Sequence, residues 1–148
     1  MDFDKYREFK DFIRSTLPEW ESLEDDEIQL NRLSSLSNLV LLVTSTKPVN
    51  PKEVIFRKFA TKEGVVDRDK EALVFLEMSK RGYGPKCYGG NSEYRLEEYF
   101  NARPIQNKEY NMPEFRRKLA LSLANFHKIS VKGIDKTPLF EKDFNDPK

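Results

Sequence analysis

The sequence of 148 residues contains very little cysteine and no long apolar run. Cys87 is its only cysteine, which excludes an intramolecular disulfide and a cysteine-rich metal site and is typical of a reducing compartment. No continuous apolar stretch is long enough to span a bilayer, and the start at Met1-Asp2-Phe3-Asp4 lacks the basic and apolar regions of a secretion signal. These absences predict a cytoplasmic protein without membrane insertion.

An excess of charge of one sign is also missing. The chain has 26 Lys and Arg against 25 Asp and Glu, giving a formal net charge of +1. Such a balance creates no global field that would attract nucleic acid or an acidic membrane, so a nucleic-acid-binding function is disfavoured. A hydrophobic fraction of 38% with 34% charged residues suits a soluble domain with one modest core.

The N-terminal segment, residues 1–27, reads as a helix followed by an acidic connector. From Asp4 to Leu17 the apolar residues recur with helical spacing, and Pro18 ends the pattern. The polar face mixes both charges, so packing on the rest of the chain is favoured over binding to a membrane surface. Acidic residues follow from Glu19 to Glu27, and Trp20 is placed to anchor this connector to the core.

Period-two patterns and turn residues predict most of the remaining elements. Residues 28–44 form a hairpin pattern with a polar turn at Ser34-Ser35, and Pro48 and Pro51 precede a third strand. That third strand is expected at 53–59. The other expected elements are a helix from about Asp67 to Arg81-Gly82, strands at 87–89 and 94–99, and a last helix from Met112-Pro113. The predicted fold class is α+β, a five-stranded antiparallel sheet with flanking helices.

One pair of charged residues points to chemistry. Arg57 lies inside the apolar strand pattern Val54 to Phe59, and Glu71 follows in the next helix. A strand cation oriented by a carboxylate on the following helix is how kinase-type small lobes hold nucleotide phosphates. An arginine in an amphipathic strand also commonly points to solvent, so the pair alone leaves both interpretations open.

Several short blocks, in order, resemble the nucleotide-binding lobe of the choline/ethanolamine kinase family. Together they cover about Ile28 to Ser130. The blocks are Leu36-Ser37-Asn38-Leu39, Val54 to Phe59, Asp67-Arg68 with Glu71, Gly84-Pro85-Lys86 with Tyr88-Gly89, Arg95-Leu96-Glu97-Glu98, and Asn125-Phe126-His127. The resemblance implies a protein-kinase-like small lobe.

The resemblance also implies roles for individual residues in binding ATP. Arg57 would contact the phosphates, and Glu71 would orient Arg57. A phosphate-covering loop would consist of Ser34, Ser35, Leu36, Ser37 and Asn38. A hinge lining the adenine slot would consist of Glu98, Tyr99 and Phe100, with Arg103 in the same nucleotide-contacting segment.

The sequence departs from the family at two points. Ser34-Ser35 replaces the two glycines that usually precede Leu-Ser-Asn in the phosphate loop, and serine lacks the conformational freedom of glycine. Nothing after His127 resembles the catalytic aspartate loop or the metal-binding aspartate of the C-terminal lobe. We therefore expect a fragment of a longer protein, with an ATP-binding lobe at 28–104 and an inter-lobe helix and start of the missing lobe at 105–148. The ligands of Mg²⁺ are expected in that missing lobe.

The resulting functional prediction is an ATP-dependent kinase lobe whose full-length protein phosphorylates the hydroxyl of choline or ethanolamine. Alternatives remain open: a non-catalytic module that keeps the fold for binding a partner, and a related kinase of the aminoglycoside-phosphotransferase type. His127 is the only histidine, but no Ser, Cys or Asp partner accompanies it at a motif spacing, so packing or helix capping is favoured over catalysis.

Overall fold

The computed structural model describes residues 3–35, 38–60 and 67–134. Its strands form one five-stranded sheet in the order β1-β2-β3-β5-β4, and every neighbouring pair is antiparallel. This confirms the predicted fold class. The elements are α1 (Phe3–Thr16), the 3-10 turns η1 (Pro18–Trp20) and η2 (Asp25–Glu27), β1 (Ile28–Leu33), β2 (Leu39–Ser45), β3 (Glu53–Lys58), α2 (Arg68–Lys80), β4 (Cys87–Gly90), β5 (Tyr94–Glu98), the 3-10 turn η3 (Asn107–Asn111) and α3 (Pro113–His127).

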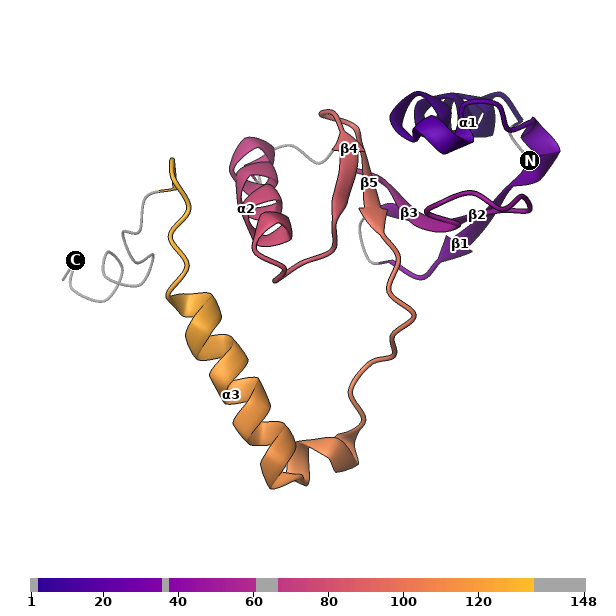
Figure 1. Ribbon diagram of the computed structural model, residues 1–148. Coiled ribbons are helices and arrows are strands. Elements are labelled where there is room, and N and C mark those ends of the chain that lie inside the picture. The colour runs from indigo at the N-terminus through magenta and orange to yellow at the C-terminus, as the bar shows by residue number, and fades with distance from the viewer. Residues whose placement is uncertain (1–2, 36–37, 61–66, 135–148) are drawn as a thin grey trace, which may run out of the picture.

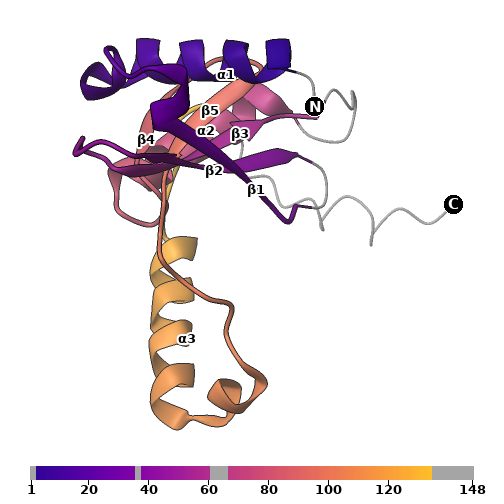
Figure 2. The ribbon, with the colours of Figure 1, turned by 90° about the vertical axis from the view of Figure 1, so that its right-hand side faces the viewer.

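Helix α1 covers one face of the sheet, as its apolar stripe predicted (Figure 2). Phe9 and Ile13 of α1 are fully buried in the same cluster as Phe56 of β3 and Leu96 of β5. Trp20 is also fully buried, and its indole Nε1 donates to the backbone oxygen of Pro51 at 2.9 Å. The segment at residues 3–27 therefore shares one hydrophobic core with the sheet.

Helix α2 lies on the other side of the sheet, beside β4 and β5 (Figure 1). Its start and end follow from the sequence: the Asp67 side chain accepts a hydrogen bond from the backbone amide of Lys70, and Gly82 after the helix has a φ of +72°. Leu73 and Leu76 remain exposed, which leaves α2 only partly covered.

After β5 the chain leaves the sheet and runs through η3 into α3, which projects away from the lobe (Figures 1 and 2). Several of its apolar side chains are exposed, namely Leu119, Leu121, Leu123 and Phe126. The chain then returns towards α2, where Arg81 donates to the backbone oxygen of Ser130 at 3.5 Å. Within the described residues, no helix is both long and apolar enough to cross a membrane.

Candidate functional site

The sheet face opposite α1 carries a cluster of charged side chains. Strands β3 and β5 pair so that Arg57 lies opposite Arg95, and Ile55 lies opposite Glu97. Because alternate side chains of a strand point to opposite faces, Arg57, Arg95 and Glu97 share the face turned away from Phe56 and Leu96. Glu71 of α2 completes this group, which we call the charged network: Arg57, Glu71, Arg95 and Glu97.

Arg57 is held by one edge of its guanidinium group. Its Nε donates to Glu97 Oε1 at 2.7 Å and its Nη2 donates to Glu97 Oε2 at 3.0 Å. The side chain remains 27% exposed, and Nη1 has no hydrogen-bond partner among the residues that the structure describes. A guanidinium fixed on one side and open on the other is suited to bind a planar, anionic group such as a phosphate edge.

Glu97 supports both arginines. Its Oε1 accepts hydrogen bonds from Arg57 Nε at 2.7 Å and from Arg95 Nε at 2.8 Å, and the residue is only 4% exposed. Burial alone would raise the pKa of Glu97, but the hydrogen bonds from Arg57 and then Arg95 outweigh it, so the pKa lies below its ordinary value. The hydrogen bond to Glu97 in turn raises the pKa of Arg57. Burial acts in the opposite direction, and the negative charge of Glu71 adds to the rise.

The prediction that Glu71 orients Arg57 by direct contact is wrong. Glu71 instead accepts two hydrogen bonds from Arg95 Nη1, at 3.0 and 3.2 Å, while Glu97 is the carboxylate that contacts Arg57. The physical reason is the strand register, which places Arg95 beside Arg57 on the face towards α2. Arg95 thus fills the space between the helix carboxylate and Arg57. Within the described residues, Glu71 is linked to Arg57 by hydrogen bonds only through Arg95 and Glu97.

The loop between β1 and β2 lies next to Arg57. Val40 pairs with Arg57 across β2 and β3, and the Asn38 side chain accepts a hydrogen bond from the backbone amide of Ala60 at 3.2 Å. Ser34 and Ser35 are exposed. The remaining predicted members of this loop, Leu36 and Ser37, lie outside the described residues. The structure therefore brings one end of the predicted phosphate loop to the end of β3.

An apolar patch on the same face was not predicted. Val40 and Ile55 are each 8% exposed, Leu42 is partly buried, and the pairings Val40 with Arg57 and Leu42 with Ile55 place them beside the charged network. An apolar surface next to a cation is the kind of lining that suits the ring of a purine base. The signal was available, because β2 has apolar residues at consecutive positions, as a strand covered on both faces requires.

The predicted hinge follows directly from β5. The Glu98 amide donates to the backbone oxygen of Lys86 at 2.8 Å, and its carboxylate accepts from the Lys86 amide at 3.0 Å, so Glu98 is held by the residue that precedes β4. Tyr99 is partly buried and Phe100 is 53% exposed. Arg103 is exposed and donates twice to Glu109, each time at 2.8 Å. That pair, together with the Gln106 amide, lowers the pKa of Glu109 to about 2.

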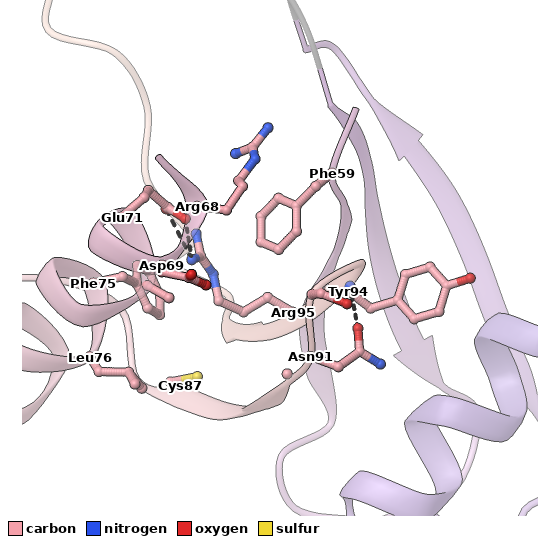
Figure 3. Close-up of a pocket in the computed structure, with 13 residues that line it drawn as sticks. Phe59, Arg68, Asp69, Glu71, Phe75, Leu76, Cys87, Asn91, Tyr94 and Arg95 are labelled. Atoms are coloured by element: carbon pink, nitrogen blue, oxygen red, sulfur yellow. Dashed lines mark hydrogen bonds and ion pairs between the residues drawn. The ribbon is translucent and has the colours of Figure 1, made fainter. Parts of the chain in front are cut away.

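A cavity of about 310 Å³ lies between α2 and the hairpin of β4 and β5 (Figure 3). Phe59, Phe75 and Cys87 line it together with Glu71 and Arg95, whereas Arg57 does not. Burial raises the pKa of the Cys87 thiol, which disfavours a reactive thiolate. The cavity thus borders the charged network on the side of α2.

The described part of the chain contains no cluster of three or more His, Cys, Asp or Glu side chains that could hold a metal ion. His127 ends α3 in an exposed position, with its ring centroid 6.2 Å from that of Phe126.

Comparisons with known proteins agree with the geometry. The family model described as choline/ethanolamine kinase matches residues 30–145. A human choline/ethanolamine kinase is 30% identical over 76% of this chain and 30% of its own length, and a probable choline kinase 2 of Arabidopsis thaliana is 29% identical over 92% of this chain and 40% of its own. The chain thus spans about 30% to 40% of the length of these two curated relatives.

Solved structures show the same fold. A choline kinase from Cryptosporidium parvum Iowa II matches with a TM-score of 0.74 at 21% identity, covering 93% of this chain and 39% of that one. An ethanolamine kinase from Plasmodium vivax matches with a TM-score of 0.61 at 15% identity, covering 75% of this chain and 30% of that one. With a family model that matches most of its residues, the chain belongs to the choline/ethanolamine kinase family.

Proposed function

We propose that this chain is the ATP-binding lobe of a kinase that phosphorylates the hydroxyl group of choline or ethanolamine. Membership of the family supports the reaction class, and the relatives are named for both substrates. The observation that carries the nucleotide-binding role is the held guanidinium of Arg57, with Nη1 open and an apolar patch beside it.

In this proposal the residues of the lobe bind and orient the nucleotide. Arg57 donates to phosphate oxygens from its open edge, and Val40 and Ile55 contact the adenine ring. Backbone groups near Tyr99 bind the edge of the base, and Ser34, Ser35 and Asn38 close over the phosphates. Positioning the phosphates in this way is the main contribution that a small lobe makes to phosphoryl transfer.

In this proposal the described residues bind ATP, and residues elsewhere in the protein hold Mg²⁺. When bound, Mg-ATP supplies the transferable phosphoryl group. The metal ligands, the base that accepts the proton of the amino alcohol and the acceptor pocket are proposed to lie in a second lobe, because phosphoryl transfer requires them and the described residues include no metal cluster.

The test is binding of Mg-ATP to the full-length protein, measured as the rise in Tm and as a Kd by calorimetry. We expect Mg-ATP to raise the Tm and Arg57→Ala to weaken binding by about 30-fold, the equivalent of about 2 kcal/mol for charge-assisted hydrogen bonds. Arg57→Lys keeps the charge but loses the planar fork, so we expect a loss of intermediate size. Arg7→Ala, an exposed arginine on α1, is the matched control and should leave the Kd unchanged.

Phosphotransfer assays with choline and with ethanolamine then identify the acceptor. Transfer to one of them, lost in Arg57→Ala, supports the kinase. The alternative is a non-catalytic module, which is motivated by Ser34-Ser35 in the phosphate loop. If the Tm of the full-length protein does not respond to Mg-ATP and phosphate is transferred to neither amino alcohol, the result contradicts the kinase and supports the non-catalytic module.

A further inference from the structure

Arg95 binds two carboxylates of the protein through two of its three guanidinium nitrogens. Its Nε donates to Glu97 at 2.8 Å and its Nη1 donates to Glu71 at 3.0 Å. The guanidinium carbon lies 3.7 Å from the ring centroid of Phe75 and 5.1 Å from that of Phe59 (Figure 3). The residue is 8% exposed. The Arg57 side chain is 27% exposed and the Arg95 side chain 10%, so Arg57 is the more accessible of the two to a ligand.

The position of Arg95 is unusual in electrostatic terms. It lies directly across the strand pair from Arg57, and like charges in directly opposite positions are destabilising. Glu97 offsets the repulsion because its Oε1 accepts a hydrogen bond from each arginine. A buried pair of this kind gives little net stability compared with apolar residues of the same size. Stability alone therefore does not account for Arg95.

The contacts form one continuous path from α2 to the open cation. Two residues of α2 fix the plane of the Arg95 guanidinium group. Glu71 accepts hydrogen bonds from its Nη1, and the Phe75 ring packs against its face. Arg95 then holds Glu97, and Glu97 holds Arg57 at 2.7 and 3.0 Å.

We propose that Arg95 is a positioning residue that couples the placement of α2 to the phosphate-binding orientation of Arg57 through Glu97. The inference rests on the proposed function and adds a residue to it. It replaces the direct contact between helix carboxylate and strand cation by a relay of three hydrogen-bonded contacts through two intervening residues, Arg95 and Glu97. A lysine at this position would keep the charge, but a single ammonium group cannot reproduce the planar fork that joins Glu71 to Glu97 and stacks on Phe75.

The first experiment compares Mg-ATP with adenosine, which lacks phosphates, by calorimetry on the full-length protein. We expect Arg95→Lys to weaken Mg-ATP binding by about tenfold and adenosine binding by less than about twofold. In the background of Arg57→Ala, Arg95→Lys should have no further effect on Mg-ATP. Equal losses for both ligands would show a merely structural role, and additive losses in the double variant would show that Arg95 acts independently of Arg57. Either result overturns the proposal.

Glu71→Gln tests the same path from the helix side, in case Arg95→Lys does not fold. The Glu71 side chain is 32% exposed, so its substitution is better tolerated than that of Arg95. We expect the same selective loss of Mg-ATP binding, at about threefold. Arg81→Lys is the matched control: Arg81 is an exposed arginine that pairs with Glu77 of α2, outside the charged network, and should change neither ligand.

A measurement without nucleotide separates the inference from the proposed function. We expect the NMR signal of the Arg57 Nε proton to be protected from exchange, and Arg95→Lys to shift it and speed its exchange. If wild type binds no Mg-ATP but the signal responds in this way, the proposed function fails while the relay stands. An Arg57 signal unchanged by Arg95→Lys, in a folded variant, contradicts the relay whatever the nucleotide does.

Discussion

The two faces of the sheet differ, although the same strands supply both: one is an aromatic core under α1, and the other carries charged side chains beside an apolar patch. Under α1 the rings of Phe9, Phe56 and Tyr94 pack with centroids 4.7 to 5.7 Å apart. On the other face, Arg57 and Glu97 form the open end of the charged network. Along β3 and β5, one step in the sequence therefore separates a residue of the core from a residue of the proposed site.

The energetics of the two faces differ as well. Burying a large apolar side chain stabilises a fold by about 1.5 to 3 kcal/mol, whereas a buried ion pair is often no better than an apolar pair of equal volume. The α1 face thus supplies most of the stability. The charged face contributes mainly a fixed arrangement of charges, which is what a ligand site requires. Substitutions on the two faces should consequently have separable effects.

The largest effect is expected from Phe56→Ala. Phe56 is fully buried and contacts both α1 and Tyr94, so its removal leaves a cavity in the core and should lower the free energy of unfolding by about 4 kcal/mol. Urea unfolding of the chain measures this loss. Phe126→Ala on α3, where the side chain is 43% exposed, is the control and should cost less than about 0.5 kcal/mol. Similar losses in both variants would contradict the assignment of the core to the α1 face.

On the charged face, Glu97→Gln should lower the free energy of unfolding by about 2 kcal/mol. It leaves two neighbouring guanidinium groups without their shared carboxylate, and the partial exposure of Arg57 moderates the penalty. Unlike Phe56→Ala, this change should also weaken Mg-ATP binding, because it frees Arg57. Glu53→Gln, at the exposed start of β3, serves as the control. Unfolding that is unaffected by Glu97→Gln would show that the charged network is not formed.

The pH dependence of the same variant sharpens the comparison. The folded-state pKa of Glu97 lies below its ordinary value of 4.5. A carboxyl group with a depressed pKa stabilises the fold fully above its unfolded-state pKa, and this stabilisation is lost as the pH falls through the lower folded-state pKa. The difference in unfolding free energy between wild type and Glu97→Gln should therefore be largest near pH 6 to 7 and shrink below about pH 4. A constant difference would contradict an ionised Glu97.

Local signals were sufficient to predict much of the fold. Helix α2 begins directly after Asp67, and Gly82 follows its end with a positive φ, as the sequence indicated. The stripe of Phe9 and Ile13 on α1 is buried as expected. Each of these predictions depends on neighbours within one or two helical turns, where spacing determines which residues meet.

The partner of Arg57 could not be predicted in this way. Glu97 is 40 positions away, and it meets Arg57 only because β5 pairs with β3 in one particular register. A shift of one residue would have turned Glu97 towards α1 and Leu96 towards α2. A partial signal existed, since Arg95 and Glu97 alternate with the buried Tyr94 and Leu96 and so had to share a face. Glu71 was correctly placed on α2, but the second arginine on that face was overlooked.

The smallest of these effects is expected from Tyr94→Phe, which tests the edge of the α1 face. The Tyr94 hydroxyl donates to Glu8 Oε1 at 2.5 Å, and burial together with that contact raises the pKa of Tyr94 above its ordinary value. The ring stays packed in the variant, and Glu8 is exposed to water, so the lost hydrogen bond should lower the free energy of unfolding by about 0.5 to 1 kcal/mol. Urea unfolding detects this change, with the exposed Tyr83→Phe as the control. Mg-ATP binding should not change, because Tyr94 and Arg57 lie on opposite faces of adjacent strands; a weakened Kd would mean that the two faces are coupled.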